Sequence, residues 1–301
     1  MMKNLSGPRE KGQALLVVLL SMAVILTVVL SIISRSITDI SLTSYSEDAL
    51  RAFSAAEAGV ERALIVGTDV SEAIGDASFI ANVSGLGEGS SFFNYPVEIY
   101  SGESVYIWFV SHNPTTGALT CSGQPCFTGN SAEFCWGKPG TPPDDSSPAI
   151  EVSYLIDMSQ RGVLNGNFVD ALIGRSVHDP NSGRQSINKF QLAQSSGCSM
   201  PDGTNYAFTS GSIPLTGIPC YQTPGCMLAV RVRSLYNPVS SPNPIGIKVG
   251  GGLLPAQGKL IKSQGTTSSQ SSVRKIEAYR TFGGPAPIFD ATVFSQGSVS
   301  K

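Results

Sequence analysis

Six cysteines are the residues of this chain whose type and number most clearly indicate chemistry. They are Cys121, Cys126, Cys135, Cys198, Cys220 and Cys226. All six lie after residue 120, and an even number of cysteines is typical of disulfides formed in an oxidising compartment. The sequence does not determine the pairing. The simplest arrangement has local bridges Cys121–Cys126 and Cys220–Cys226, which leaves Cys135–Cys198.

A zinc site and reduced structural thiols are the alternatives to disulfides. The sequence has no C-x2-C pair, and its two histidines, His112 and His178, are not at the spacing of zinc ligands. The spacing therefore favours disulfides and predicts no metal site.

Other polar groups do not form a pattern typical of catalysis. His178 adjoins Asp179, yet neighbours in sequence rarely face each other productively. Asp144 and Asp145 follow two prolines, which indicates a solvated turn. The run Gly250–Gly252 lacks the following helix that a dinucleotide site requires. We expect no enzyme activity and no cofactor; an anchored hydrolase is the third alternative.

Composition limits the class of partner. The chain has 301 residues, a net charge of −2 and only 14 % charged residues. No cluster of Lys and Arg indicates a nucleic-acid partner. The abundance of Gly, Ser, Thr, Asn and Pro favours a β-rich domain with long loops.

An apolar segment near the N-terminus predicts a membrane-spanning helix. Seventeen of the twenty residues of Ala14–Ile33 are apolar; the exceptions are Ser21, Thr27 and Ser31. A helix of this length spans about 30 Å, which matches the hydrocarbon core of a bilayer. A cleaved signal peptide and a buried core helix are the alternatives. The run is longer than the apolar region of most signal peptides, and Ser31–Arg35 is a poor cleavage site.

The charges that flank this segment predict its orientation. Lys3, Arg9 and Lys11 precede it, and the nearest charges beyond Arg35 are acidic. The positive-inside rule places the N-terminus in the cytoplasm and residues after about 35 outside. We expect a single pass through the cell (inner) membrane, with the remaining chain extracytoplasmic.

The helical pattern continues beyond the apolar segment. Apolar positions recur at steps of three and four, which lines one helix face; they are Ile37, Ile40, Tyr45, Ala49, Ala52, Phe53, Ala56, Val60, Ala63 and Leu64. Gly67 is a plausible terminator. We predict one continuous helix over residues 13–66, with its membrane part at 14–33. Its alanine-rich stripe allows a sheet to approach closely.

Two segments of this helix resemble the type IV pilin-like proteins, in particular the PilX-type minor pilins. The first is Arg9-Glu10-Lys11-Gly12-Gln13-Ala14-Leu15-Leu16, and the second is Ala52-Phe53-Ser54-Ala55-Ala56-Glu57-Ala58-Gly59-Val60-Glu61-Arg62-Ala63. The resemblance covers residues 9–66. It implies a leader peptide of residues 1–12, a prepilin peptidase that cuts between Gly12 and Gln13, and a helix that moves from the membrane into a filament. Its implied partners are other pilin subunits, the peptidase and the pilus assembly machinery.

The chain departs from the pattern of major pilins at two positions. The mature chain would begin with Gln13 rather than phenylalanine or methionine. Its fifth residue would be Val17, where that family carries a glutamate that is thought to meet the N-terminal amine of a neighbouring subunit. The departure is compatible with a subunit at a filament tip, or with a chain that shares only the export route.

Residues 67–301 are expected to form an exported β-rich domain. Alternating segments predict strands at 150–156 and 227–235, and hairpins at 95–100 with 105–110 and at 259–262 with 273–282. Segment 105–110 is apolar on both faces and suggests a central strand. A further short strand is expected through Val293 and Phe294. Irregular stretches are expected at 113–148, 181–218 and 236–257, two of them bridged by cysteines. The fold class is α+β: the long helix packs on an antiparallel sheet.

The sequence thus predicts a minor pilin or pseudopilin, a non-enzymatic subunit of a type IV pilus or related secretion filament, with the tip as one location. Its exported domain would lie on the cell surface or on the pilus. The alternative is a single-pass anchored adhesin or binding module that does not polymerise.

Overall fold

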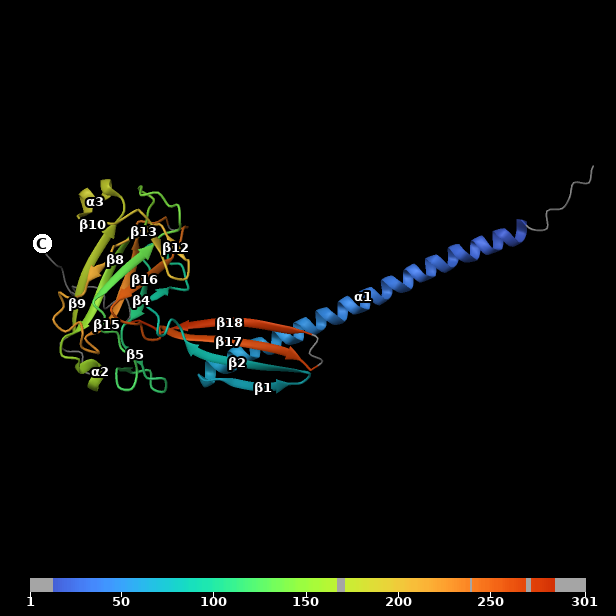
Figure 1. The fold of residues 1–301 in the computed structure, drawn as a ribbon, viewed down its shortest axis with the longest axis horizontal. Coiled ribbons are helices and arrows are strands. Elements are labelled where there is room, and N and C mark those ends of the chain that lie inside the picture. The colour runs from blue at the N-terminus through green and yellow to red at the C-terminus, as the bar shows by residue number, and fades with distance from the viewer. Residues whose placement is uncertain (1–12, 167–170, 239, 269–271, 285–301) are drawn as a thin grey trace, which may run out of the picture. The chain divides into compact units, whose positions relative to one another are not determined.

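The computed structural model describes residues 13–166, 171–238, 240–268 and 272–284 (Figure 1). These residues fold into two compact units. The helix unit comprises residues 13–82 with 262–277, and the sandwich unit comprises residues 83–261 with 278–284. The predicted α+β fold is confirmed: a long N-terminal helix, antiparallel sheets and disulfide-bonded loops are all present. The predicted strand at Val293 and Phe294 lies outside the described residues.

Helix α1 spans Gln13–Val66 without interruption, as predicted. It contains no proline, and its only glycine is Gly59. Gly67 ends the helix, as the sequence suggested, because its φ of 79° lies in the left-handed region. Its N–H donates to the carbonyl of Ala63 at 2.8 Å, which satisfies one of the last helical acceptors.

Most of a four-stranded sheet belongs to the helix unit. Its order is β1 (Val70–Ile74), β2 (Ala77–Gly85), β17 (Gly258–Thr267) and β18 (Val273–Thr281). In β2 the residues Ala77, Phe79 and Ala81 are buried, and those between them are exposed. This alternation shows that one face of the sheet is covered. The strands β17 and β18 are the C-terminal pair predicted from sequence, although β17 is longer than predicted.

The helix and the sheet approach each other closely. A Cβ atom on Gly59 would lie 2.7 Å from the ring of Phe79. A Cβ atom on Gly265, in β17, would overlap the carbonyl oxygen of Ala52 and lie 2.6 Å from the backbone nitrogen of Ala56. The backbones of strand and helix are therefore in direct contact, and only small residues fit between them.

A larger residue at position 265 is therefore expected to destabilise the helix unit. We expect Gly265→Val to lower the free energy of unfolding by about 3 kcal/mol, because the clash is with backbone atoms that cannot move aside. Urea unfolding of the full chain in detergent measures the change. Gly217→Val is the matched control, since a Cβ there meets no atom within 4 Å. Equal midpoints for the two variants would contradict the close contact.

The sandwich unit contains two five-stranded sheets. The first has the order β10 (Gln191–Leu192), β9 (Ala171–Asp179), β8 (Ala149–Asp157), β15 (Met227–Leu235) and β4 (Ser104–Trp108). The second has the order β13 (Phe208–Thr209), β7 (Ser131–Trp136), β16 (Ile245–Gly250) and β3 (Phe92–Asn94), with β14 (Ile213–Pro214) also paired to β7. The short pairs β5 (Ser111–His112) with β6 (Leu119–Thr120) and β11 (Cys198–Ser199) with β12 (Asn205–Tyr206), together with helices α2 (Arg161–Asn165) and α3 (Ser182–Asn188), complete the unit.

The inner faces of these two sheets share one hydrophobic core. It includes the fully buried Ile150 and Val152 of β8, and Phe134 and Trp136 of β7. The rings of Phe134 and Tyr154 meet edge to face with centroids 6.2 Å apart. The inward positions predicted in 150–156 are confirmed in this core, but Ser153, on the opposite face, is buried as well. Burial of this core supplies the main hydrophobic stabilisation of the unit.

Several predictions about the strands are wrong in detail. Residues 95–100 form no strand, and β4 pairs instead with β15, which makes β4 an edge strand rather than a central one. Both β7 and β16 lie in stretches that were predicted to be irregular. One pairing, between β9 and β10, is parallel. The partners of β4 and β7 are distant in sequence, so local alternation gave no indication of those pairings.

Candidate functional site: the exposed surface of helix α1

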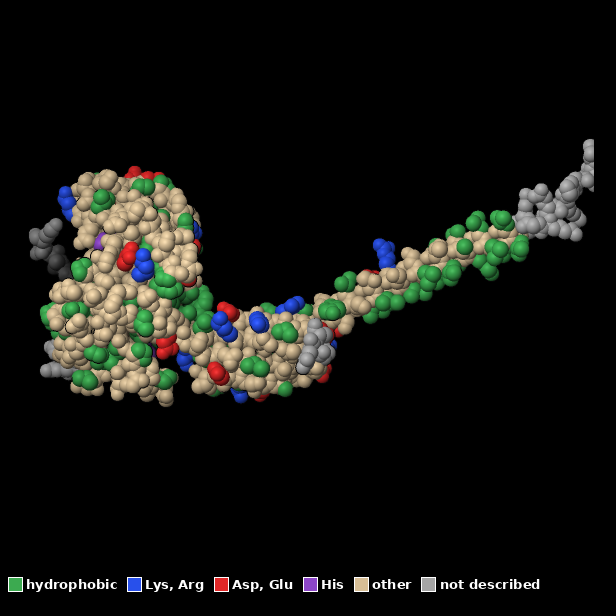
Figure 2. All heavy atoms as spheres, in the orientation of Figure 1, with side chains coloured by type: hydrophobic (Ala, Val, Ile, Leu, Met, Phe, Trp, Pro, Cys, Tyr) green, Lys and Arg blue, Asp and Glu red, His purple; other side chains and the backbone are tan. Residues whose placement is uncertain are grey.

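The N-terminal half of α1 presents an apolar surface that the rest of the described chain leaves uncovered. Every described side chain from Leu15 to Glu47 is exposed. Figure 2 shows hydrophobic side chains along this length of the helix. The helix is long and apolar enough to cross a membrane. An apolar surface of this size is unfavourable in water and requires lipid or other apolar helices around it.

Two hydroxyl groups in the apolar half, those of Ser21 and Thr27, are hydrogen-bonded within the helix. Ser21 Oγ donates to the carbonyl of Val18, and Thr27 Oγ1 donates to the carbonyl of Val24, both at 2.8 Å. A hydroxyl group without a partner would be costly in hydrocarbon. These bonds allow Ser21 and Thr27 to lie in lipid without a partner from another molecule.

The predicted processing site lies at the end of the described chain. Gly12 is outside the described residues, and Gln13 is the first residue of α1. Val17, at the position where major pilins carry a glutamate, is exposed on the apolar surface.

The C-terminal half of α1 contributes a much narrower buried stripe than predicted. Ala52, Ala56 and Ala63 are fully buried, and Ala55 and Gly59, which were not among the predicted positions, are buried as well. The larger members of the predicted stripe remain exposed: Phe53 by 42 %, Tyr45 by 66 % and Leu64 by 39 %. Only small side chains lie against the sheet, because the sheet backbone approaches too closely for larger ones.

All six cysteines are in disulfides, in the pairing that the sequence analysis gave as the simplest. The bridges are Cys121–Cys126, Cys135–Cys198 and Cys220–Cys226. Glu133 lies close enough to Cys135 and Cys198 for a metal cluster. Both sulfur atoms are already bonded to each other, however, and Glu133 pairs with Lys248 at 3.0 Å. This cluster is therefore a structural crosslink.

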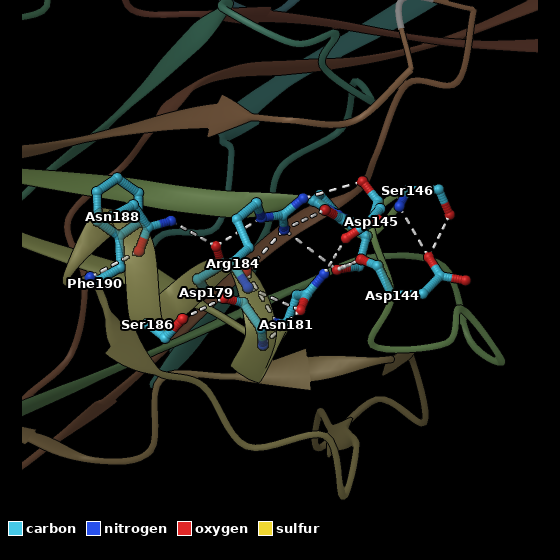
Figure 3. A network of polar contacts seen from close by, with 12 residues as sticks. Asp144, Asp145, Ser146, Asp179, Asn181, Arg184, Ser186, Asn188 and Phe190 are labelled. Atoms are coloured by element: carbon cyan, nitrogen blue, oxygen red, sulfur yellow. Dashed lines mark hydrogen bonds and ion pairs between the residues drawn. The ribbon is translucent and has the colours of Figure 1, made fainter.

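The structure does not bring His178 and Asp179 together as a catalytic pair. His178 Nε2 lies 3.3 Å from Ser176 Oγ, and its ring lies beside Trp136. Asp179 faces Arg184, which donates to both carboxylate oxygens at 2.7 Å (Figure 3). Burial raises the pKa of Asp179, but hydrogen bonds from Arg184, the Asn181 N–H and Asn188 outweigh it and hold the pKa below its usual range.

Asp179 and Arg184 belong to a network that joins the loop at Asp145 and Ser147 to the end of β9 and to helix α3. Arg184 also donates to the carbonyl oxygens of Ser147 at 2.8 Å and of Asp145 at 3.1 Å. Asn181 caps the N-terminus of α3, and its Nδ2 donates to Asp145 Oδ1 at 2.7 Å (Figure 3). Nothing in the sequence pattern predicted this network. Asn181, a preferred N-cap residue, was the one local signal that could have predicted α3.

The buried His178 predicts a loss of stability in acid. Burial lowers its pKa to about 4 from an ordinary value of 6.5. The unfolded state therefore binds the proton first as the pH falls, so stability is constant above about pH 7 and decreases between about pH 6.5 and 4. We expect this residue to contribute about 3 kcal/mol to that decrease.

The measurement is the free energy of unfolding from pH 4 to 8 for the full chain and for His178→Gln. The variant should retain a shallower dependence, because burial also lowers the pKa of His112 to about 4. An unchanged pH dependence in the variant would show that His178 is not the group responsible.

Comparisons of this chain with protein-family models, with curated proteins and with solved structures found no match. The functional assignment therefore depends on the residues and geometry of α1 and of the units that follow it.

Proposed function

We propose that this protein is a minor pilin or pseudopilin, a non-enzymatic structural subunit of a type IV pilus or related secretion filament, with the filament tip as one location. The observation that carries the proposal is the uninterrupted helix Gln13–Val66, which is apolar and uncovered in its first half and docked on a sheet in its second. Such a helix can be held by lipid before assembly and by equivalent helices afterwards.

The resemblance of residues 9–66 to PilX-type minor pilins supports the same proposal. Gly12 and Gln13 would be the processing site, and the flanking basic residues would keep the N-terminus in the cytoplasm. The partners would be a prepilin peptidase, the assembly machinery and other pilin subunits. The disulfide-bonded sandwich unit would be extracytoplasmic, where disulfides persist.

The N-terminus of the protein isolated from membranes tests this proposal. Co-expression with a prepilin peptidase should give an intact mass and an N-terminal sequence that begin at Gln13. Gly12→Val should abolish the cut, whereas Gly7→Val, a matched change within the predicted leader, should leave it intact. A chain that begins at Met1, or one cut near residue 31, would overturn the proposal.

One observation favours a second candidate function. Val17 replaces the glutamate that, in the major pilins, is thought to meet the N-terminal amine of a neighbouring subunit. A chain without that charge fits an anchored adhesin or binding module that does not polymerise. Crosslinking between cysteines introduced on α1 separates the two: dimers and higher species support a filament subunit, and monomers alone support the anchored module.

A further inference from the structure

Single apolar side chains of α1 recur beyond the predicted membrane segment. Ile37, Ile40 and Leu42 are each about as exposed as Leu15–Ile33, at 60 %, 66 % and 62 %. These three residues alternate with Ser, Thr and charged residues, so the end of the apolar surface is gradual and does not by itself fix the depth of the helix in a bilayer. Some other feature must set the depth at which the helix sits.

Arg35 is the first charge after the apolar run. From Gln13 to Ser34 the helix rises about 33 Å, which places Arg35 at the level where a bilayer changes from hydrocarbon to headgroups. A guanidinium group at this level is costly in hydrocarbon and favourable beside phosphate oxygens, which it binds in a bidentate manner.

The guanidinium of Arg35 is available for such a partner. Its side chain is exposed, and no ion pair in the described chain involves it. Asp39 lies one turn further along the helix. A helical ion pair is weaker when the cation precedes the acid, as Arg35 precedes Asp39, than in the reverse order. Arg51, by contrast, has acidic partners on the helix: its Nη2 lies 3.7 Å from Glu47 Oε2 and its Nη1 lies 3.8 Å from Asp48 Oδ1.

We propose that Arg35 binds the phosphodiester of a membrane phospholipid and thereby fixes the depth of α1 in the bilayer. Sliding inward would carry its charge into hydrocarbon, and sliding outward would expose apolar residues to water. This inference depends on the membrane insertion in the proposed function, but it does not depend on processing at Gly12 or on filament assembly.

The experiment uses the full chain reconstituted into phosphatidylglycerol vesicles. All six native cysteines are in disulfides, so a cysteine introduced at Thr38, one turn beyond Arg35, is the only thiol. Its rate of labelling by a membrane-impermeant maleimide reports whether position 38 is in water. Adding Arg35→Gln should slow labelling about fivefold, the effect of losing one cation at an anionic surface.

Matched variants distinguish the outcomes. Arg35→Lys should restore most of the labelling rate, and Arg51→Gln should leave it unchanged. Equal rates with and without Arg35→Gln would overturn the inference, as would an equal slowing in maltoside micelles, which contain no phosphodiester. An equal slowing by Asp39→Asn that depends on protein concentration would also overturn it, in favour of an ion pair between copies. Failure of the chain to float with vesicles would instead contradict the membrane anchor itself.

Discussion

Replacing Arg184 by methionine is expected to lower the free energy of unfolding by about 3–5 kcal/mol, because it leaves the buried carboxylate of Asp179 without its cation. The carboxylate is fully buried, and Arg184 supplies two of its hydrogen bonds. The substitution also removes the donors to the carbonyl oxygens of Asp145 and Ser147. Chemical unfolding of the full chain at pH 7 measures the loss.

The matched control is Arg51→Met, which removes an arginine from an exposed pair. Glu47 and Arg51 are 61 % and 54 % exposed, so we expect a loss of less than about 1 kcal/mol. The double variant Asp179→Asn with Arg184→Met should be less destabilised than Arg184→Met alone, since no buried charge remains. If Arg184→Met were no more harmful than Arg51→Met, the network would not stabilise the sandwich unit.

Removing the Cys135–Cys198 bridge is expected to have a comparable effect. The bridge joins residues 63 positions apart, and the chain-entropy relation gives about 4 kcal/mol for a loop of that length. The expected change is a fall of that size in the free energy of unfolding of the Cys135→Ala, Cys198→Ala variant. The same relation gives about 2 kcal/mol for Cys121–Cys126, whose cysteines are five positions apart.

The comparison of the two double variants is informative because both replace two cysteines by alanine and differ strongly in loop length. Cys135 and Cys198 are also buried, whereas Cys121 and Cys126 are partly exposed, so a cavity adds to the loss at the long-range bridge. Unfolding in urea, followed by circular dichroism, gives both free energies. A loss for Cys121→Ala, Cys126→Ala equal to or greater than that for the long-range bridge would contradict the entropic explanation.

The parts of the fold that were predicted correctly depend on local sequence. Helix α1, its end at Gly67 and strands β8 and β15 follow from periodicity and from residues a few positions apart. The second sheet was missed because β7 and β16 are short and contain Gly246, Cys135 and charged residues. Their burial depends on strand partners that are far away in the sequence.

The candidate site was predictable in its position but not in its details. The apolar run indicated the membrane segment, and the repeated alanines indicated a close contact with a sheet. The sequence did not reveal that Phe53 and Leu64 would stay exposed, because that depends on how closely Gly265 approaches Ala52. Nor did it reveal the partner of Asp179, which requires Asn181 to begin a helix and Arg184 to turn back toward the strand.

The contact between α1 and its sheet has a consequence for mechanical strength. Alanine and glycine have no side-chain rotamers to freeze, so forming this joint costs almost no side-chain entropy. For the same reason the joint cannot yield by rearranging side chains when the helix is pulled along its axis. A pulling force on α1 would therefore be transmitted from the backbone near Ala52 to the strand at Gly265 with little deformation of the contact.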